Sequence, residues 1–118
     1  MASDIIFDPA EIRRQCRAGS FSGYTAGHAP GRVQANLMIV PRAQAYDFSV
    51  FCQRNPKPCP VLDITDPGDP EPRAIAPGAD IRRDLPRYRV FRHGELVDEP
   101  TDITDLWRDD LVGFLIGC

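Results

Sequence analysis

The chain has 118 residues, enough for one domain with a hydrophobic core of its own. Its 42% hydrophobic and 26% charged residues are typical of a globular protein and argue against disorder of the whole chain. A net charge of −3 argues against a nucleic-acid partner, and no apolar run approaches the length of a membrane span.

The first residues contain no basic segment followed by an apolar core, so the sequence predicts no signal peptide and a cytoplasmic location. The cysteines are Cys16, Cys52, Cys59 and Cys118. They include no C-x-x-C pair and lie far in sequence from His28 and His93, so zinc-site spacing is absent and no metal site is expected. Reduced thiols are the default without a secretory signal, and a free cysteine is most often a small buried hydrophobe.

Residues 8–18 are the first predicted helix. Asp8 suits the N-cap, Pro9 suits the first helical position, and Glu11 completes a capping box. Gly19 is a natural C-terminal stop. The arginines of this helix form either a solvated face or an anion-binding group.

Residues 19–31 are predicted to be a loop, because a glycine returns at every fourth position. A loop of this length without structure of its own is either functional or mobile. It lacks the lysine and the strand–loop–helix context of a phosphate-binding loop. Thr25 and His28 are the polar side chains of this loop that could take part in binding or catalysis.

Residues 32–40 become continuously apolar and β-branched before Pro41, which predicts a buried strand. Gln34 and Asn36 share one face of that strand, because side chains alternate with a period of two. Two amides in such a strand are costly unless they are satisfied. They either bond neighbouring backbone or face a ligand.

Residues 43–54 have the pattern of a helix, with Ala45, Phe48 and Cys52 on one face. Residues 55–60, N-P-K-P-C-P, follow directly. Three prolines in six residues remove three backbone donors, which predicts a stiff, extended corner that is neither helix nor central strand. This corner is either a ledge that positions polar groups or a helix terminator before a strand.

Residues 61–64 form the next predicted strand, and residues 66–78 are rich enough in proline and glycine to be a surface loop. Residues 80–86 alternate charges of both signs. They are either a solvated turn with weak ion pairs or the place where an arginine clamps a carboxylate bidentately. Residues 87–97 form a predicted hairpin with its turn at His93.

A final helix is predicted after a cap at Thr101 or Asp102, with apolar residues from Ile103 onward on or beside one face. The chain stops at Cys118 immediately after an apolar run. We therefore expect either that this chain is a portion of something longer or that its end docks on another chain.

A family resemblance that extends from about residue 11 to residue 118 is carried by four stretches: TAGHAPGRVQANL, AYDFSVFCQRNPKPCP, DIRRDLPRYRVFRHGELV and DITDLWRDDLVGFLIGC. They resemble the D-glutamate cyclase family, also carried under the name "putative hydro-lyase". The corner and the QANL strand are the specific segments. The family continues beyond the final Gly-Cys, so the chain resembles only its N-terminal portion. Arg32 departs from the family pattern, which usually has an aromatic residue there.

The resemblance implies an α/β fold, with mixed α+β as the alternative, in which residues 1–118 are one incomplete N-terminal part without an internal boundary. It implies a lyase that removes water, with D-glutamate closing to 5-oxo-D-proline as the named reaction. It implies no metal or organic cofactor. The expected partner is a small acidic substrate, with neither nucleic acid nor membrane, and a homo-oligomer or a docked C-terminal portion is compatible with this.

Site residues are assigned from the chemistry of the reaction, which needs an arginine for the substrate carboxylate, donors for an oxyanion and an acid–base group. The expected substrate-binding residues are Thr25, Gln34, Asn36, Lys57 and Arg82. The expected catalytic residues are Asn55, Asp84 and Cys118, with Cys59 as a further candidate. Two alternatives remain open: a small-carboxylate-binding module without turnover, because sites are grafted on folds, and an inactive truncated fragment.

Overall fold

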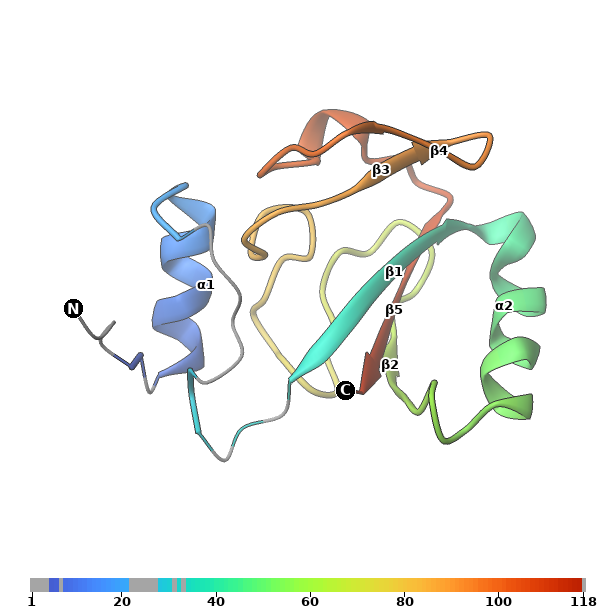
Figure 1. Ribbon diagram of the computed structural model, residues 1–118, viewed down its shortest axis with the longest axis horizontal. Helices are drawn as coiled ribbons and strands as arrows, with labels where there is room; N and C mark the ends of the chain where they lie inside the picture. The colour runs from blue at the N-terminus through green and yellow to red at the C-terminus, as the bar shows by residue number, and fades with distance from the viewer. Residues whose placement is uncertain (1–4, 7, 22–27, 31, 33, 118) are drawn as a thin grey trace. The chain divides into compact units, whose positions relative to one another are not determined.

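The computed structural model describes residues 5–6, 8–21, 28–30, 32 and 34–117 of the chain. Its elements, in chain order, are α1 (Pro9–Arg17), β1 (Ala35–Pro41), α2 (Arg42–Arg54), β2 (Val61–Ile64), β3 (Val90–Arg92), β4 (Glu95–Asp98), the 3-10 helix η1 (Thr104–Leu106) and β5 (Leu111–Gly117). Helices and antiparallel strands make up a mixed α/β structure, which confirms the expected fold class (Figure 1).

The chain divides into two compact units. The α1 unit comprises Met1–Arg32 and Arg82–Leu106, and the sheet unit comprises Val33–Ile81 and Trp107–Cys118. Each unit therefore draws on two separated stretches of sequence. The expectation of a single domain over residues 1–118 stays a prediction.

The sheet unit is organised around β5, the central strand of a three-stranded antiparallel sheet with the order β1-β5-β2. β1 pairs with β5 over its full length, from Ala35 opposite Gly117 to Pro41 opposite Leu111. β2 pairs with the other edge of β5, with Ile64 opposite Phe114. A strand paired on both edges has its backbone donors and acceptors satisfied without water, so β5 can be buried.

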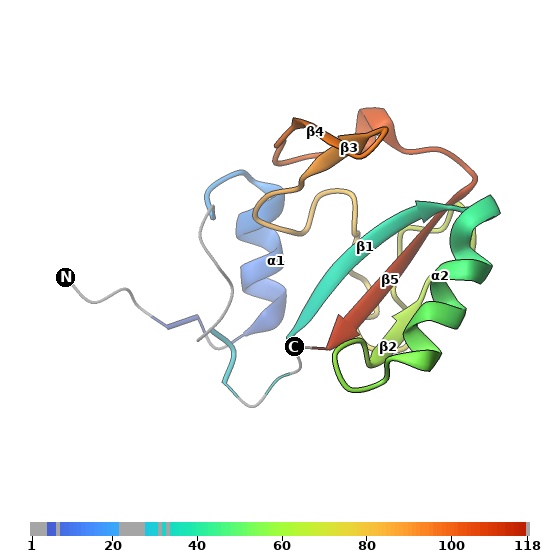
Figure 2. The same cartoon turned by 45° about the vertical axis from the view of Figure 1, so that its right-hand side comes forward.

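α2 lies across one face of this sheet, as Figure 2 shows. Its residues Ala45, Phe48 and Cys52 pack on a cluster of buried residues from β5, Val112, Phe114 and Ile116. The alternation of a strand puts these three side chains on one face. Phe48 meets Phe114 edge to face, with ring centroids 4.9 Å apart. The helical face predicted from the sequence is therefore the face that closes the core, and each fully buried large apolar side chain contributes about 1.5–3 kcal/mol.

The predicted final helix is wrong. The apolar run forms β5, a strand of seven residues, and only Thr104–Leu106 before it is helical. A short apolar run fits a buried helix and a buried strand equally well, and pairing with β1 and β2 decides for the strand. The predicted cap is present in reduced form, because the Asp102 carboxylate accepts a hydrogen bond from the Thr104 backbone at 2.7 Å.

β1 is less buried than the sequence predicts. Its residues Asn36 and Met38 are exposed, and Met38 keeps 46% of its surface accessible. β1 lies at the edge of the described sheet, opposite β2. Both residues lie on the face that α2 covers, because Met38 pairs with Phe114 and Asn36 with Ile116. α2 thus covers the central strand fully and the edge strand only in part.

In the α1 unit the first predicted helix is confirmed. The Asp8 carboxylate caps α1 by accepting a hydrogen bond from the Ala10 backbone at 3.0 Å, and Pro9 opens the helix. The capping box is not the arrangement found, because the carboxylate of Glu11 accepts hydrogen bonds from Arg14 and Gln15. Ile12 packs with Cys16 and Ala29 in a small buried cluster.

The predicted hairpin is also confirmed, as β3 and β4 pair around His93 and Gly94. Both turn residues have positive φ, 51° and 80°, which is the conformation of a tight hairpin turn. The corner between α2 and β2 is neither helix nor strand, as expected. It turns back on itself instead of extending, because the Cys59 backbone donates to the Asn55 carbonyl at 3.0 Å.

An ion pair between Arg17 and Asp84 joins the two stretches of the α1 unit. Arg17 of α1 donates from Nε and Nη2 to the two carboxylate oxygens of Asp84, at 2.7 and 2.6 Å. The side chain of Asp84 is 1% exposed and that of Arg17 is 39% exposed. The bidentate clamp that residues 80–86 suggested is therefore present, with the carboxylate in that segment and the arginine on α1.

Gly113→Ala tests the close packing of β5. A Cβ at Gly113 would lie 2.4 Å from Cδ1 of Ile81, which is 2% exposed. We expect the substitution to lower the free energy of unfolding by about 1–3 kcal/mol, because overpacking forces neighbours to shift. Urea denaturation measures this. The Ile81→Val background removes the clashing methyl group, so there the loss should shrink; an equal loss in both backgrounds would contradict the packing argument.

Arg17→Met tests the ion pair of the α1 unit, since methionine keeps much of the apolar stem. We expect a loss of about 1–2 kcal/mol in the free energy of unfolding, because a buried carboxylate loses two charge-assisted hydrogen bonds while the exposed part of Arg17 is screened. Arg14→Met is the matched control on the same helix, where Arg14 is 71% exposed and pairs with Glu11. That control should cost at most about 0.5 kcal/mol. Equal losses would remove the structural role of the Arg17–Asp84 pair.

Candidate functional site

The corner at residues 55–60 starts from Asn55, the C-cap residue of α2. The Asn55 side chain donates from Nδ2 to the Phe51 carbonyl at 2.8 Å, which satisfies one of the last carbonyls of the helix. The Asn55 backbone donates to the Cys52 carbonyl at 3.1 Å. Asn55 is therefore engaged as a helix terminator, the second of the two alternatives for the corner, and one of the two N–H groups of its side-chain amide makes this contact.

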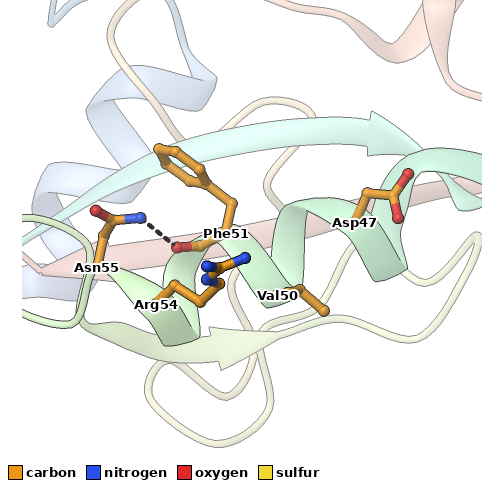
Figure 3. Close-up of a pocket in the computed structure, with 5 residues that line it drawn as sticks. All are labelled: Asp47, Val50, Phe51, Arg54 and Asn55. Atoms are coloured by element: carbon orange, nitrogen blue, oxygen red, sulfur yellow. Dashed lines mark hydrogen bonds between the residues drawn. The ribbon is translucent and has the colours of Figure 1, made fainter.

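A shallow hollow lies beside this helix end, and Figure 3 shows the side chains around it. It is lined by Asp47, Val50, Phe51, Arg54 and Asn55. These positions follow the i, i+3, i+4, i+7, i+8 spacing of one helix face, so they lie along α2. Phe51 is 53% exposed and stacks on Phe48 with ring centroids 6.3 Å apart. The hollow thus combines an exposed aromatic ring with a guanidinium and a carboxylate.

Of the predicted site residues, Asn55 lines this hollow. Gln34, Asn36 and Lys57 belong to the same unit and are not among its lining residues. Asn36 and Lys57 are exposed, and Gln34 is half-buried. Arg54 and Asp47 also line the hollow and were not among the residues predicted from the sequence. Their helical spacing from Asn55 would have indicated that they share a face with it.

Arg82 and Asp84 lie together in the α1 unit. Arg82 is half-buried, and its carbonyl accepts a hydrogen bond from the Ile103 backbone at 3.0 Å. Asp84 is 6% exposed, and both of its oxygens accept hydrogen bonds from Arg17. The pKa of the Cys16 thiol is raised to about 11, first by burial and second by the negative charge of Asp84.

His28 has a structural partner. Its Nδ1 accepts a hydrogen bond from the Ile6 backbone at 3.0 Å, which puts the ring proton of the neutral form on Nε2. Its ring meets Phe21 edge to face, with centroids 5.3 Å apart. Thr25 and Cys118, two other predicted site residues, lie outside the described residues. Their roles stay predictions.

Within the described part of the chain, no group of three or more His, Cys, Asp or Glu side chains is arranged to hold a metal ion. None of the helices in that part is long and apolar enough to cross a membrane. The cysteines described, Cys16, Cys52 and Cys59, are free thiols.

Comparison with known proteins places the chain beside bacterial proteins named "putative hydro-lyase". It is 66% identical over 110 residues to one from Stutzerimonas stutzeri (strain A1501) and 59% identical over 110 residues to one from Bacillus licheniformis. It is 60% identical over 109 residues to one from Rubrobacter xylanophilus. These matches cover 92–93% of the chain and 42% of each relative.

The chain therefore spans about two fifths of the length of these relatives. No protein-family model matches the chain, so its place in the D-glutamate cyclase family stays a prediction. What the comparisons establish is close similarity, along almost all of the chain, to part of the proteins that carry the hydro-lyase name.

Proposed function

We propose that the chain is part of a hydro-lyase, an enzyme that eliminates water, and that its reaction is the cyclisation of D-glutamate to 5-oxo-D-proline. The observation that carries this proposal is the 66% identity to a protein of that name over 93% of the chain. The chain spans 42% of that relative, so we assign the reaction to a protein of the relative's length. The choice of D-glutamate rests on the family resemblance of the corner and the QANL strand.

The reaction forms one bond and breaks one. The neutral amine attacks the γ-carboxyl carbon, a C–N bond forms, and a tetrahedral intermediate carries the developing oxyanion. The nitrogen gives up one proton to the acid–base group, the C–O bond breaks, and the oxygen leaves as water after protonation. Such a reaction needs a cation for the α-carboxylate, hydrogen-bond donors for the oxyanion, and a group that takes and returns a proton.

In this proposal Arg82 binds the α-carboxylate and Asp84 moves the proton. Both lie in the same unit within one short segment, which supports a joint role. Both carboxylate oxygens of Asp84 already accept hydrogen bonds from Arg17. For Asp84 to transfer a proton, one of these oxygens must bind the proton while it shares, or gives up, its contact with Arg17. Arg17 is thereby a positioning residue for the proposed acid–base group.

The remaining donor and charge roles are proposed from side-chain chemistry alone. Gln34, Asn36 and Asn55 supply the donors, and exposed Lys57 anchors charge. One N–H of the Asn55 amide donates to the Phe51 carbonyl, and the proposed contact with the substrate uses the other N–H. Asn36 is exposed on its strand. Thr25 and Cys118 complete the proposed set.

Activity is tested in the Stutzerimonas stutzeri relative after its matched segment is replaced by this chain, so that the residue identities are known. We expect this hybrid to convert D-glutamate to 5-oxo-D-proline. Arg82→Ala should lower kcat/KM by roughly 10- to 100-fold, the effect of one lost charge-assisted hydrogen bond. Arg89→Ala is the control, since Arg89 is 71% exposed and lies next to the hairpin.

Two outcomes distinguish a wrong substrate from a wrong assignment of the site residues. If neither the hybrid nor the relative makes 5-oxo-D-proline, D-glutamate is the wrong substrate. If the hybrid is active and both Arg82→Ala and Asn55→Ala leave kcat/KM unchanged, the substrate stands and the site assignment is wrong. The stability of Asn55→Ala should be measured by urea denaturation alongside its activity, because loss of the hydrogen bond to the Phe51 carbonyl alone costs about 1 kcal/mol.

A second candidate function is binding of a small carboxylate without turnover. The hollow on α2 favours it, because Arg54 projects there beside Asn55 and no catalytic group is needed (Figure 3). Titration calorimetry of this chain with D-glutamate should then show saturable binding that Arg54→Gln weakens roughly tenfold or more. Arg42→Gln, at the other end of α2, is the matched control. Absence of heat with the folded chain would remove this candidate.

A further inference from the structure

Two thiols of the sheet unit are neighbours in space. Cys52 is on the inner face of α2 and is 1% exposed, and Cys59 is half-buried in the corner. Cys59 packs against the buried cluster that contains Cys52. This proximity follows from the backbone, because two hydrogen bonds fold the chain back on itself between them. The Asn55 backbone donates to the Cys52 carbonyl at 3.1 Å, and the Cys59 backbone donates to the Asn55 carbonyl at 3.0 Å.

The two thiols also interact and differ in access. Burial raises the pKa of the Cys52 thiol above its ordinary value, and the neighbouring Cys59 thiol raises it further. Cys52 is therefore protonated at neutral pH and shielded from solvent, so it is a poor first target for an oxidant. Cys59 keeps part of its surface accessible, so a small reagent reaches it first.

We propose that Cys52 and Cys59 are a redox-sensitive pair that a low-molecular-weight disulfide, such as oxidised glutathione, converts into an intramolecular disulfide. The Cys59 thiolate attacks one sulfur of the reagent, whose S–S bond breaks and releases one thiol. Cys52 then attacks the Cys59 sulfur, and the proton of its thiol passes to the second reagent sulfur, which leaves as a thiol. Two protein thiols lose two electrons in all, and one reagent disulfide becomes two thiols.

The new bond would fix the corner to α2. Asn55 lies inside the closed ring, between the two cysteines, so the bond would restrict the residue that caps α2. The redox state would thereby set the conformational freedom of residues 52–59. This inference does not depend on the proposed function, because it concerns two thiols and the reagent alone.

Peptide mapping tests the proposal directly. Trypsin cuts after Arg42, Arg54 and Arg73 and is blocked at Lys57 by the proline that follows, so the two thiols fall in separate peptides, residues 43–54 and 55–73. The folded, reduced chain is treated with oxidised glutathione, quenched in acid, alkylated and digested without reductant. We expect these two peptides to be joined, with a mass two hydrogens below their sum, and to separate on reduction.

Three variants sharpen the test. In Cys52→Ser, glutathione should accumulate on Cys59, because the second thiol that would displace it is gone. In Cys59→Ser, the bridge should be absent and Cys52 should remain mostly unmodified because it is buried. Cys16→Ser is the control, since Cys16 lies in the α1 unit, and there the bridge should form as in the original chain. Circular dichroism verifies that each variant is folded.

The proposal is overturned if the original chain retains glutathione on Cys59 as persistently as Cys52→Ser does, because then Cys52 does not react. It is also overturned if the joined peptides contain Cys16 or Cys118 in place of this pair, or if no thiol is oxidised under conditions that oxidise the unfolded chain. Oxidation in urea supplies that reference and should give mixed pairings, whereas the folded chain should give one.

Discussion

Burial of β5 is the constraint on which the sheet unit depends. This strand is paired on both edges and carries Val112, Phe114 and Ile116 into the contact with α2. Its backbone hydrogen bonds and its apolar side chains are therefore satisfied together, which a helix in the same place would not achieve with the same partners. β1 and β2 are aligned through β5 and not with each other, so the position of α2 and of the corner that follows it depends on this one strand.

The corner shows how structural and chemical demands meet on the same residues. Its prolines end α2, its first residue caps the last turn, and its cysteine packs against the core. Asn55 and Cys59 were chosen as site candidates for their chemistry, and both have structural contacts that account for them. A functional role for either residue must therefore be compatible with its part in holding the corner against α2.

The same holds in the α1 unit. Asp84 has a buried carboxylate, which is a common feature of catalytic acids and bases, yet Arg17 accounts for its burial through two charge-assisted hydrogen bonds. His28 likewise accepts a backbone hydrogen bond at Nδ1. Residue type alone does not separate a catalytic group from a structural one, because a buried polar group needs partners in either role. The support for a hydro-lyase therefore comes from similarity to other proteins and not from the site geometry.

The sequence by itself determined the elements whose signals are local. Asp8 and Pro9 define the start of α1, helical spacing in residues 43–54 defines α2 and its buried face, and the turn at His93 and Gly94 defines the hairpin. Of the candidate site, it determined the corner after α2, since the prolines act on their own neighbours.

Only the tertiary structure decided which secondary structure residues 111–117 adopt, how much of β1 is exposed, and which arginine holds Asp84. The reason is physical. Each of these depends on contacts between residues far apart in sequence, such as Asn36 with Ile116 or Arg17 with Asp84. A periodic pattern records which faces are apolar but not which distant segment will cover them, and for a short apolar run that partner decides between helix and strand.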